Sequence, residues 1–324
     1  MTALAHQRQA RLHIERQFAR AALRQFDLTE AHVRLLRYSS PMLFVVDGET
    51  RAILRLHPPD RHPFAVVHSE LVWLQTLSTY PDLLVPQPIP TGDGRLLIEV
   101  VNAEQTDSRY ASLLRWIPGH HQVHRLGKQT VQKLGRVLAH LHDAAVQFQP
   151  PPGFLRWDGL DDDFCGSAAS IAKADPSLLS DEERHITQQA LQVIDRTIRH
   201  FERHPTTYGL IHGDTNLSNF IYHRGRIAII DFEVCCYGAY LYDITRTYIM
   251  LADVDRSNIL SQTFVDSYAA LRPIPDTRDR AFVAFQLINL VDIVRWIVDL
   301  PLEYWRKGIL DQLHHTVNCI ADIL

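Results

Sequence analysis

Four polar side chains between two apolar runs have the types and spacing that phosphoryl transfer requires. The segment GLIHGDTNLSNFIYHRGRIAIIDFE covers residues 209–233 and contains His212, Asp214, Asn219 and Asp231. One carboxylate can orient an incoming hydroxyl group and accept its proton, while further oxygen atoms can hold Mg2+ against nucleotide phosphates. The flanking apolar runs predict a hairpin, which would bring Asn219 and Asp231 together. The segment therefore predicts a site for phosphoryl transfer.

The order of these residues also matches a known pattern: His-Gly-Asp, four residues, Asn, and later Ile-Asp-Phe. In this pattern the segment resembles the catalytic and metal-binding loops of the aminoglycoside phosphotransferase and choline kinase-like superfamily, the phosphotransferase enzyme family. It is also similar to homoserine kinase type II and to the bacterial stress-response kinases. The resemblance implies that Asp214 is the catalytic base, that Asn219 and Asp231 bind Mg2+, and that ATP is the phosphoryl donor. It implies a structural role for Asp243.

The first part of the chain extends the resemblance. Residues 52–56, Ala-Ile-Leu-Arg-Leu, stand where protein kinases have Val-Ala-Ile-Lys on the third strand, and Glu70 follows in the next predicted helix. Residues 1–127 contain no lysine. We therefore expect Arg55 to contact the nucleotide phosphates and to pair with Glu70, because a planar guanidinium can bridge phosphate and carboxylate oxygens.

Two further segments are expected to contact the nucleotide. The loop before the third strand has no G-x-G-x-x-G motif, so its contacts would come from the hydroxyl and backbone N–H groups of Ser39 and Ser40. Trp116 and Ile117 precede Pro118-Gly119, where the hinge between two lobes should lie. The resemblance implies that the backbone of this hinge binds the adenine edge.

The acceptor is expected to bind mainly in the second lobe. Aromatic faces and carboxylates both attract amines, so the candidates for a cationic or hydroxylated acceptor are Glu233, Trp157, Asp292 and Trp296, with Asp161–Asp163, Glu303 and Trp305 as further members of this group. Core packing on an amphipathic helix is the preferred interpretation of Trp296. A solvated loop is the preferred interpretation of the aspartate run.

Periodicity predicts a β-rich lobe in the first part of the chain. Strand-like runs at 32–38, 42–46, 51–56, 95–101 and 109–116 are joined in part by Asp47-Gly48, a hairpin turn signal. A helix is expected at 3–25 and another at 63–80. We expect residues 1–117 to form a nucleotide-binding lobe with a five-stranded antiparallel sheet.

The rest of the chain predicts a mainly helical catalytic and acceptor-binding lobe over residues 118–324. Ser180 and Glu183 have the spacing of a capping box. The fold class is therefore α+β, in a bilobal protein kinase-like arrangement. Helical periodicity covers 126–147, 181–203, 240–253, 256–271, 277–299 and 302–322.

Composition limits the classes of function. The 324 residues include 33 basic and 37 acidic side chains, so a formal charge of −4 excludes a basic nucleic-acid scaffold or anionic-membrane binder. Four cysteines without paired spacing indicate neither a disulfide framework nor a zinc site. The most apolar stretch, residues 281–300, is interrupted by Asp292, Arg295 and Asp299. We expect a soluble cytoplasmic protein.

Three functions are compatible with the sequence. The favoured one is an ATP-dependent phosphotransferase whose acceptor is a hydroxyl group of a small metabolite, amino alcohol or aminoglycoside-like antibiotic. The second is a Ser/Thr protein kinase of the bacterial stress-response type. The third is a nucleotide-binding pseudokinase that regulates a partner, since Arg55 replaces the usual lysine and the loop lacks glycine.

Overall fold

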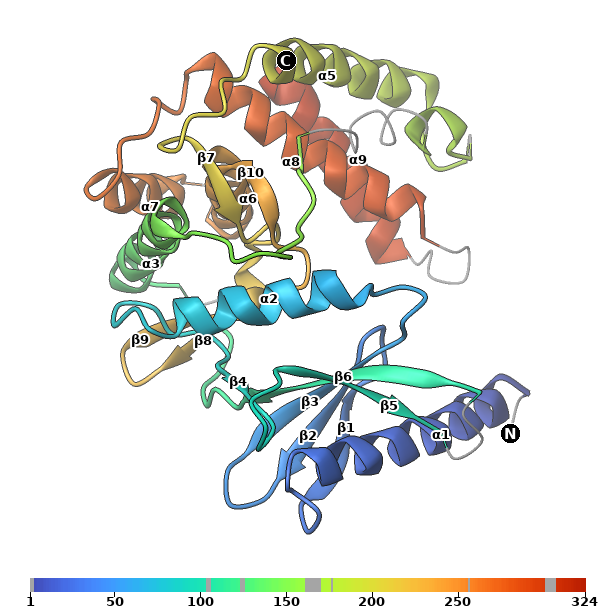
Figure 1. The fold of residues 1–324 in the computed structure, drawn as a ribbon. Helices are drawn as coiled ribbons and strands as arrows, with labels where there is room; N and C mark the ends of the chain where they lie inside the picture. The colour runs from blue at the N-terminus through green and yellow to red at the C-terminus, as the bar shows by residue number, and fades with distance from the viewer. Residues whose placement is uncertain are drawn as a thin grey trace. The chain divides into compact units, whose positions relative to one another are not determined.

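The structure, a computed structural model, describes residues 3–102, 106–122, 126–160, 170–175, 177–255, 257–300 and 307–324. It divides into two compact units. Strands dominate the first unit and helices the second, which confirms the predicted mixed fold (Figure 1). The first unit consists of Met1–His120, Phe148–Arg156 and Ile221–Glu233, and the second of His121–Gln147, Trp157–Phe220 and Val234–Leu324.

The first unit contains an antiparallel sheet in the order β1-β2-β3-β6-β4, with β5 also paired to β6. The expected five strands are joined by a sixth, the two-residue β4, within residues 85–90, which contain three prolines. It pairs with Leu113 and Leu114, and β5 pairs with residues 108–112, so both lie along the same edge of β6. The strands are β1 His32–Arg37, β2 Met42–Asp47, β3 Ala52–His57, β4 Pro88–Ile89, β5 Leu97–Val101 and β6 Ser108–Arg115.

Two helices of the first unit, α1 (Ala3–Gln25) and α2 (Phe64–Leu77), relate to different faces of strand β3. Side chains alternate between the two faces of a strand. Leu54 and Leu56 belong to the apolar core that includes α1 side chains such as Phe18 and Leu23. Arg55 therefore points to the other face, where it reaches α2. Figure 1 shows the sheet between these two helices.

The second unit is built mainly from helices at the predicted positions. The capping box at Ser180 and Glu183 is confirmed at the start of α5. A small antiparallel pair, β7 (Tyr208–Ile211) and β10 (Cys236–Ala239), lies among these helices (Figure 1). The helices are α3 Lys128–Gln147, α5 Asp181–Arg199, α6 Tyr240–Val254, α7 Ile259–Ala269, α8 Arg280–Val298 and α9 Lys307–Ile323.

Helix α8 is long and apolar enough to cross a membrane by length and composition alone, and it is the only such helix among the described residues. However, 67% of its most apolar window is buried inside the protein. Its Asn289 is wholly buried, and the amide donates to the carbonyl of Tyr242 over 3.0 Å and to the hydroxyl of Thr245 over 2.9 Å. These are the contacts of a core helix packed against α6.

Candidate active site

Strand β7 delivers the first group of candidate residues to the end of a short sheet. It ends at Ile211, and the loop that follows carries His212 and Asp214 before a turn of 3-10 helix at Leu217–Asn219. The pairing of Ile211 with Cys236 on β10 fixes the start of this loop. The loop is therefore held by a strand at one end and a helical turn at the other.

The carboxylate of Asp214 is held at both oxygens. The amide nitrogen of Asn219 donates to Asp214 Oδ2 over 2.8 Å and to the backbone carbonyl of Asp214 over 2.9 Å. The amide nitrogen of Asn216 donates to Asp214 Oδ1. Because the Asn219 nitrogen is directed at Asp214, Asn219 Oδ1 is the atom of that side chain that could bind a cation.

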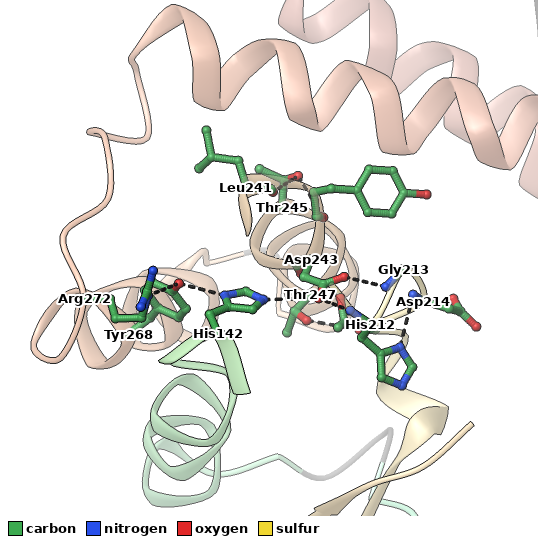
Figure 2. Close-up of polar contacts among 12 residues, drawn as sticks. His142, His212, Gly213, Asp214, Leu241, Asp243, Thr245, Thr247, Tyr268 and Arg272 are labelled. Carbon is green, nitrogen blue, oxygen red and sulfur yellow. Dashed lines mark hydrogen bonds and ion pairs between the residues drawn. The ribbon is translucent and has the colours of Figure 1, made fainter. Parts of the chain in front are cut away.

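Asp243 of helix α6 anchors the backbone of the same loop (Figure 2). Its carboxylate accepts the backbone N–H groups of His212 over 2.7 Å and Gly213 over 2.9 Å. Its backbone carbonyl accepts the hydroxyl of Thr215 over 2.7 Å. Asp243 is wholly buried, so these charge-assisted bonds satisfy a carboxylate that would otherwise be costly to bury. This geometry agrees with the structural role implied for Asp243.

Gly213 has a backbone conformation that other residues rarely adopt. Its φ is 81°, and an added Cβ would lie 2.6 Å from the carbonyl oxygen of Val234. Beside it, the wholly buried His212 accepts the backbone N–H of Asp214 at Nδ1 over 3.2 Å. The Gly and His of the motif thus shape the loop that presents Asp214, and neither is placed to react.

A buried chain of polar groups extends from Asp243 to Arg272 (Figure 2). His142 Nε2 lies 3.2 Å from Asp243 Oδ2, and His142 Nδ1 lies 2.8 Å from the hydroxyl of Tyr268. Arg272 Nε donates to the same Tyr268 oxygen over 3.2 Å. A neutral imidazole with its proton on Nε2 satisfies this order, donating to Asp243 and accepting from Tyr268. Burial lowers the pKa of His142, although the Asp243 carboxylate opposes the shift.

Protein stability is expected to fall below about pH 6.5 because of this histidine. A base whose pKa is lowered in the folded state binds its proton first in the unfolded state. The stability it contributes is therefore complete above the unfolded pKa and is lost as the pH falls through that value, by about 1.4 kcal/mol per pH unit for each proton. His57 in the first unit, also buried and with a lowered pKa, acts in the same direction.

Chemical denaturation between pH 5 and 8 measures this dependence. In His142→Gln the amide can donate to Asp243 and accept from Tyr268 without titrating, so the free energy of unfolding should fall less steeply toward pH 5 than in the wild type. Equal slopes for the two proteins would contradict a neutral buried His142.

Asp231 follows strand β9 (Arg226–Ile229) and belongs to the first unit. Its φ is 68°, an uncommon conformation for a residue other than glycine, although aspartate tolerates it better than most. Its side chain is 40% exposed, and Arg37 Nη1 lies 3.7 Å from Oδ2. An exposed carboxylate in a strained backbone position is typical of functional sites. Hard carboxylate oxygens suit Mg2+, and these features fit the predicted metal role.

Arg55 and Glu70 form a buried ion pair within the first unit, as predicted. Arg55 Nη1 donates to Glu70 Oε1 over 2.5 Å, and Nη2 donates to Oε2 over 3.0 Å. The side chains are only 7% and 2% exposed. Burial alone would lower the pKa of Arg55, but the charge and hydrogen bonds of Glu70 outweigh it and the pKa is raised. Strand β3 and helix α2 are thus joined by a bidentate ion pair.

A second group of polar side chains lies around Glu233 in the first unit. His62 Nδ1 lies 3.6 Å from Glu233 Oε1, and His62 Nε2 lies 3.1 Å from the hydroxyl of Ser40. Burial raises the pKa of Glu233 to about 7, against the attraction of Arg55 and with help from the nearby charges of Glu70 and Asp231. Glu233, expected to contact the acceptor, therefore lies beside the candidate nucleotide residues.

The other candidate nucleotide contacts are partly used by the protein itself. The hydroxyl of Ser39 donates to the carbonyl of Pro41 over 2.8 Å. The backbone N–H of Trp116 donates to the carbonyl of Arg51 over 3.1 Å, and the Arg51 guanidinium lies 4.2 Å from the centre of the Trp116 ring. This N–H is therefore committed to the sheet. Ile117 is largely buried, at 9% exposure.

Of the predicted acceptor residues in the second unit, Asp292 has the most defined surroundings. Its Oδ2 accepts the buried hydroxyl of Tyr242 over 2.8 Å, and burial together with the Asp292 charge raises the Tyr242 pKa well above its ordinary value. Trp296, one helical turn along α8, is 56% exposed, so the preferred core-packing interpretation is wrong. Trp157 is 42% exposed. Asp161–Asp163, Glu303 and Trp305 lie outside the described residues.

Two residues near Asp214 were not predicted. Asn216 lies two positions after Asp214, among the four motif positions whose residue type is not specified, so the pattern did not single it out. Arg246 comes from helix α6, and its Nη2 lies 3.8 Å from Asp214 Oδ1. A signal for Arg246 existed in its spacing, because it follows Tyr242 by four residues and so shares a helix face with it.

The sequence pattern of the phosphotransferase enzyme family matches residues 32–282. Among curated proteins, none matches the chain. Among solved structures, a microcompartment-associated aminopropanol kinase is 26% identical, with a TM-score of 0.78 over 95% of this chain and 96% of its own.

Two further structures show the same fold at lower identity. An amicoumacin kinase, solved with AMP-PNP and Ca2+, is 17% identical with a TM-score of 0.74 over 90% of this chain and 88% of its own. A spectinomycin phosphotransferase, solved with ADP and spectinomycin, is 12% identical with a TM-score of 0.64 over 90% and 93% of the two chains.

Proposed function

The chain belongs to the phosphotransferase enzyme family, and we propose on this basis that it moves the γ-phosphoryl group of ATP to a hydroxyl group of a small amino alcohol. It is a phosphotransferase with an alcohol group as acceptor. The observation that carries the proposal is the arrangement of Asp214, whose carboxylate is held at both oxygens by Asn216 and Asn219.

Asp214 acts as the base in this proposal. The acceptor hydroxyl donates a hydrogen bond to the Asp214 carboxylate, which orients it toward the phosphorus and takes its proton late in a loose transition state. The bonds from Asn216 and Asn219 hold the carboxylate in place before the substrate arrives, so little reorganisation is needed during the reaction.

Mg2+ is the proposed metal, and the residues present fit it. In the second unit Asn219 directs its amide nitrogen to Asp214, which supports Oδ1 as the proposed ligand atom, and in the first unit Asp231 offers an exposed carboxylate. Amide and carboxylate oxygens are the ligands a hard divalent cation prefers. When bound, the metal offsets phosphate charge. Arg55, fixed by Glu70, is the proposed phosphate contact in the first unit, with Ser39, Ser40, the backbone carbonyl of Trp116 and the backbone of Ile117 as further nucleotide contacts.

An amino alcohol is the proposed acceptor class. The aminopropanol kinase named above resembles this chain over nearly its whole length. Tyr242 lies one turn before Arg246 on α6, and these residues reach Asp292 and Asp214 respectively. One face of α6 thus connects the carboxylate of Asp292 with the base. We assign Asp292 to the ammonium group of the acceptor, together with the exposed Trp296 four residues further along α8, since carboxylates and aromatic rings both attract cations.

The test measures ATP consumption with a panel of amino alcohols and with alcohols of the same length that lack the amine. We expect turnover only with the amines. In Asp292→Asn the KM for the amine should rise ~10-fold or more with little change in kcat, because a hydrogen-bonded charge is lost from binding. Asp299→Asn at the C-cap of the same helix is the matched control and should keep the wild-type KM.

Other results would contradict these assignments. Turnover of the amine-free alcohols at the same kcat/KM would remove the amino alcohol class. Phosphorylated proteins in an extract incubated with labelled ATP, with no turnover of small alcohols, would favour the protein kinase alternative. Tight MgATP binding without ATP consumption across the panel would favour a pseudokinase.

A further inference from the structure

The segment 209–233 has no lysine that could neutralise the negative charge of the phosphoryl group during its transfer. Residues 209–233 contain two arginines: Arg224 lies in the turn after strand β8 (Phe220–His223), and Arg226 begins strand β9. The guanidinium of Arg226 donates to the carbonyl of Pro81 over 2.8 Å. A cation beside Asp214 within the second unit must therefore come from outside this segment.

Arg246 provides that cation from helix α6. Its Nε donates to Asn216 Oδ1 over 3.1 Å, and Nη1 donates to the carbonyl of Asn289 over 3.4 Å. Nη2 lies 3.8 Å from Asp214 Oδ1, which is an ion pair but too long for a hydrogen bond. The side chain is 16% exposed. Asn216 holds both partners, since its nitrogen bonds to Asp214 and its oxygen to Arg246.

The Nη2 group is directed at Asp214 without a hydrogen-bond partner among the described residues. A guanidinium has five N–H donors, and those on Nε and Nη1 account for the two bonds of Arg246. The two N–H groups on Nη2 thus lie beside the base and can donate hydrogen bonds to an anion.

We propose that Arg246 is a catalytic residue whose Nη2 group binds the phosphoryl group during its transfer. The proposal rests on the proposed function. In the step, the acceptor oxygen bonds to the γ-phosphorus as the bond from phosphorus to the β-γ bridging oxygen breaks. ADP leaves with that electron pair, and the hydroxyl proton passes to Asp214.

The distances support this role. A hydroxyl hydrogen-bonded to Asp214 lies about 2.7 Å from the carboxylate, and the attacked phosphorus lies within about 3.5 Å of that hydroxyl oxygen. An equatorial phosphoryl oxygen can therefore reach a guanidinium that is 3.8 Å from the same carboxylate. A cation fixed at this point stabilises the negative charge that develops on the phosphoryl group. Such preorganised electrostatic stabilisation is the largest contribution to the rate enhancement of many enzymes.

The experiment compares binding of MgADP with binding of MgADP plus fluoroaluminate, which mimics the phosphoryl group in flight. Isothermal titration of Arg246→Gln should show MgADP affinity within about twofold of wild type and a loss of ~100-fold for the fluoroaluminate complex. Arg246→Lys keeps the charge without the fork and should lose less. Arg199→Gln, an exposed arginine of the same unit, should match the wild type.

Three results would overturn the proposal. Wild-type affinity of folded Arg246→Gln for the fluoroaluminate complex would show that Arg246 does not touch the phosphoryl group. An increase only in the KM of the acceptor would assign Arg246 to an anionic group on that acceptor. A wild-type protein that binds fluoroaluminate with ADP no more tightly than ADP alone would remove phosphoryl transfer itself, and the role of Arg246 with it. If Arg246→Gln does not fold, the same titration of Arg246→Lys decides the matter, and an undiminished affinity there counts against the proposal.

Discussion

Replacing Asp214 with asparagine is expected to lower kcat by ~10²–10⁴-fold while leaving the affinity for MgATP within about twofold, the effect of losing a general base. The carboxylate accepts from Asn216 at Oδ1 and from Asn219 at Oδ2. Neither donor is a proposed contact of the nucleotide itself, although Asn219 is also the proposed Mg2+ ligand. The measurement is steady-state ATP consumption with saturating amino alcohol, together with titration of MgATP.

A second effect of this substitution must be separated from the first. Asparagine has one amide oxygen and one amide nitrogen, so at position 214 one of the two neighbouring amides would face another donor. A displaced Asn219 would weaken Mg2+ binding. Asp214→Ala places no donor opposite the two amides. If only the base is lost, both variants should show the wild-type dependence of rate on Mg2+. If Asn219 is also displaced, only Asp214→Asn should need more Mg2+. Asp195→Asn, a surface aspartate paired with Arg199, is the control. Near wild-type kcat in folded Asp214→Ala would remove the assignment of the base.

The helices were predictable because a single sequence pattern, the spacing of apolar residues, dominates each of them. Helices α3, α5, α6, α7 and α8 begin and end within a few residues of the expected positions, since an apolar stripe repeating every three to four residues has to face a core. The capping box at Ser180 was also readable locally. Strand β4 was not, because two residues bound to the edge of β6 leave no periodic pattern.

The reactive part of the site was predictable for a different reason. Asp214 and Asn219 are close in sequence, so their spacing already specifies a loop in which one amide can reach the other side chain. Arg246 and His142 act on the same loop from helices far along the chain. Their contacts depend on how α3 and α6 pack around β7, which no short pattern contains. The exposure of Trp296 was missed because a tryptophan on an apolar helix is usually buried.

Replacing Arg55 with alanine is expected to destabilise the protein by about 3–5 kcal/mol, because it leaves the buried carboxylate of Glu70 without its partner. Both side chains are nearly inaccessible to solvent and share two hydrogen bonds. The change should appear as a lower midpoint in chemical denaturation. It should also weaken MgATP binding, since the first 127 residues contain no lysine that could contact the phosphates in place of Arg55.

The double variant Arg55→Met with Glu70→Leu separates stability from function. Apolar side chains of similar size often replace a buried ion pair with no loss of stability. We therefore expect the double variant to regain most of the lost free energy of unfolding but not the affinity for MgATP. Glu70→Gln should keep more of that affinity, because Arg55 and its charge remain. If the folded double variant binds and consumes ATP at the wild-type level, Arg55 does not contact the phosphates, and the nucleotide site of the first unit must be assigned to other residues.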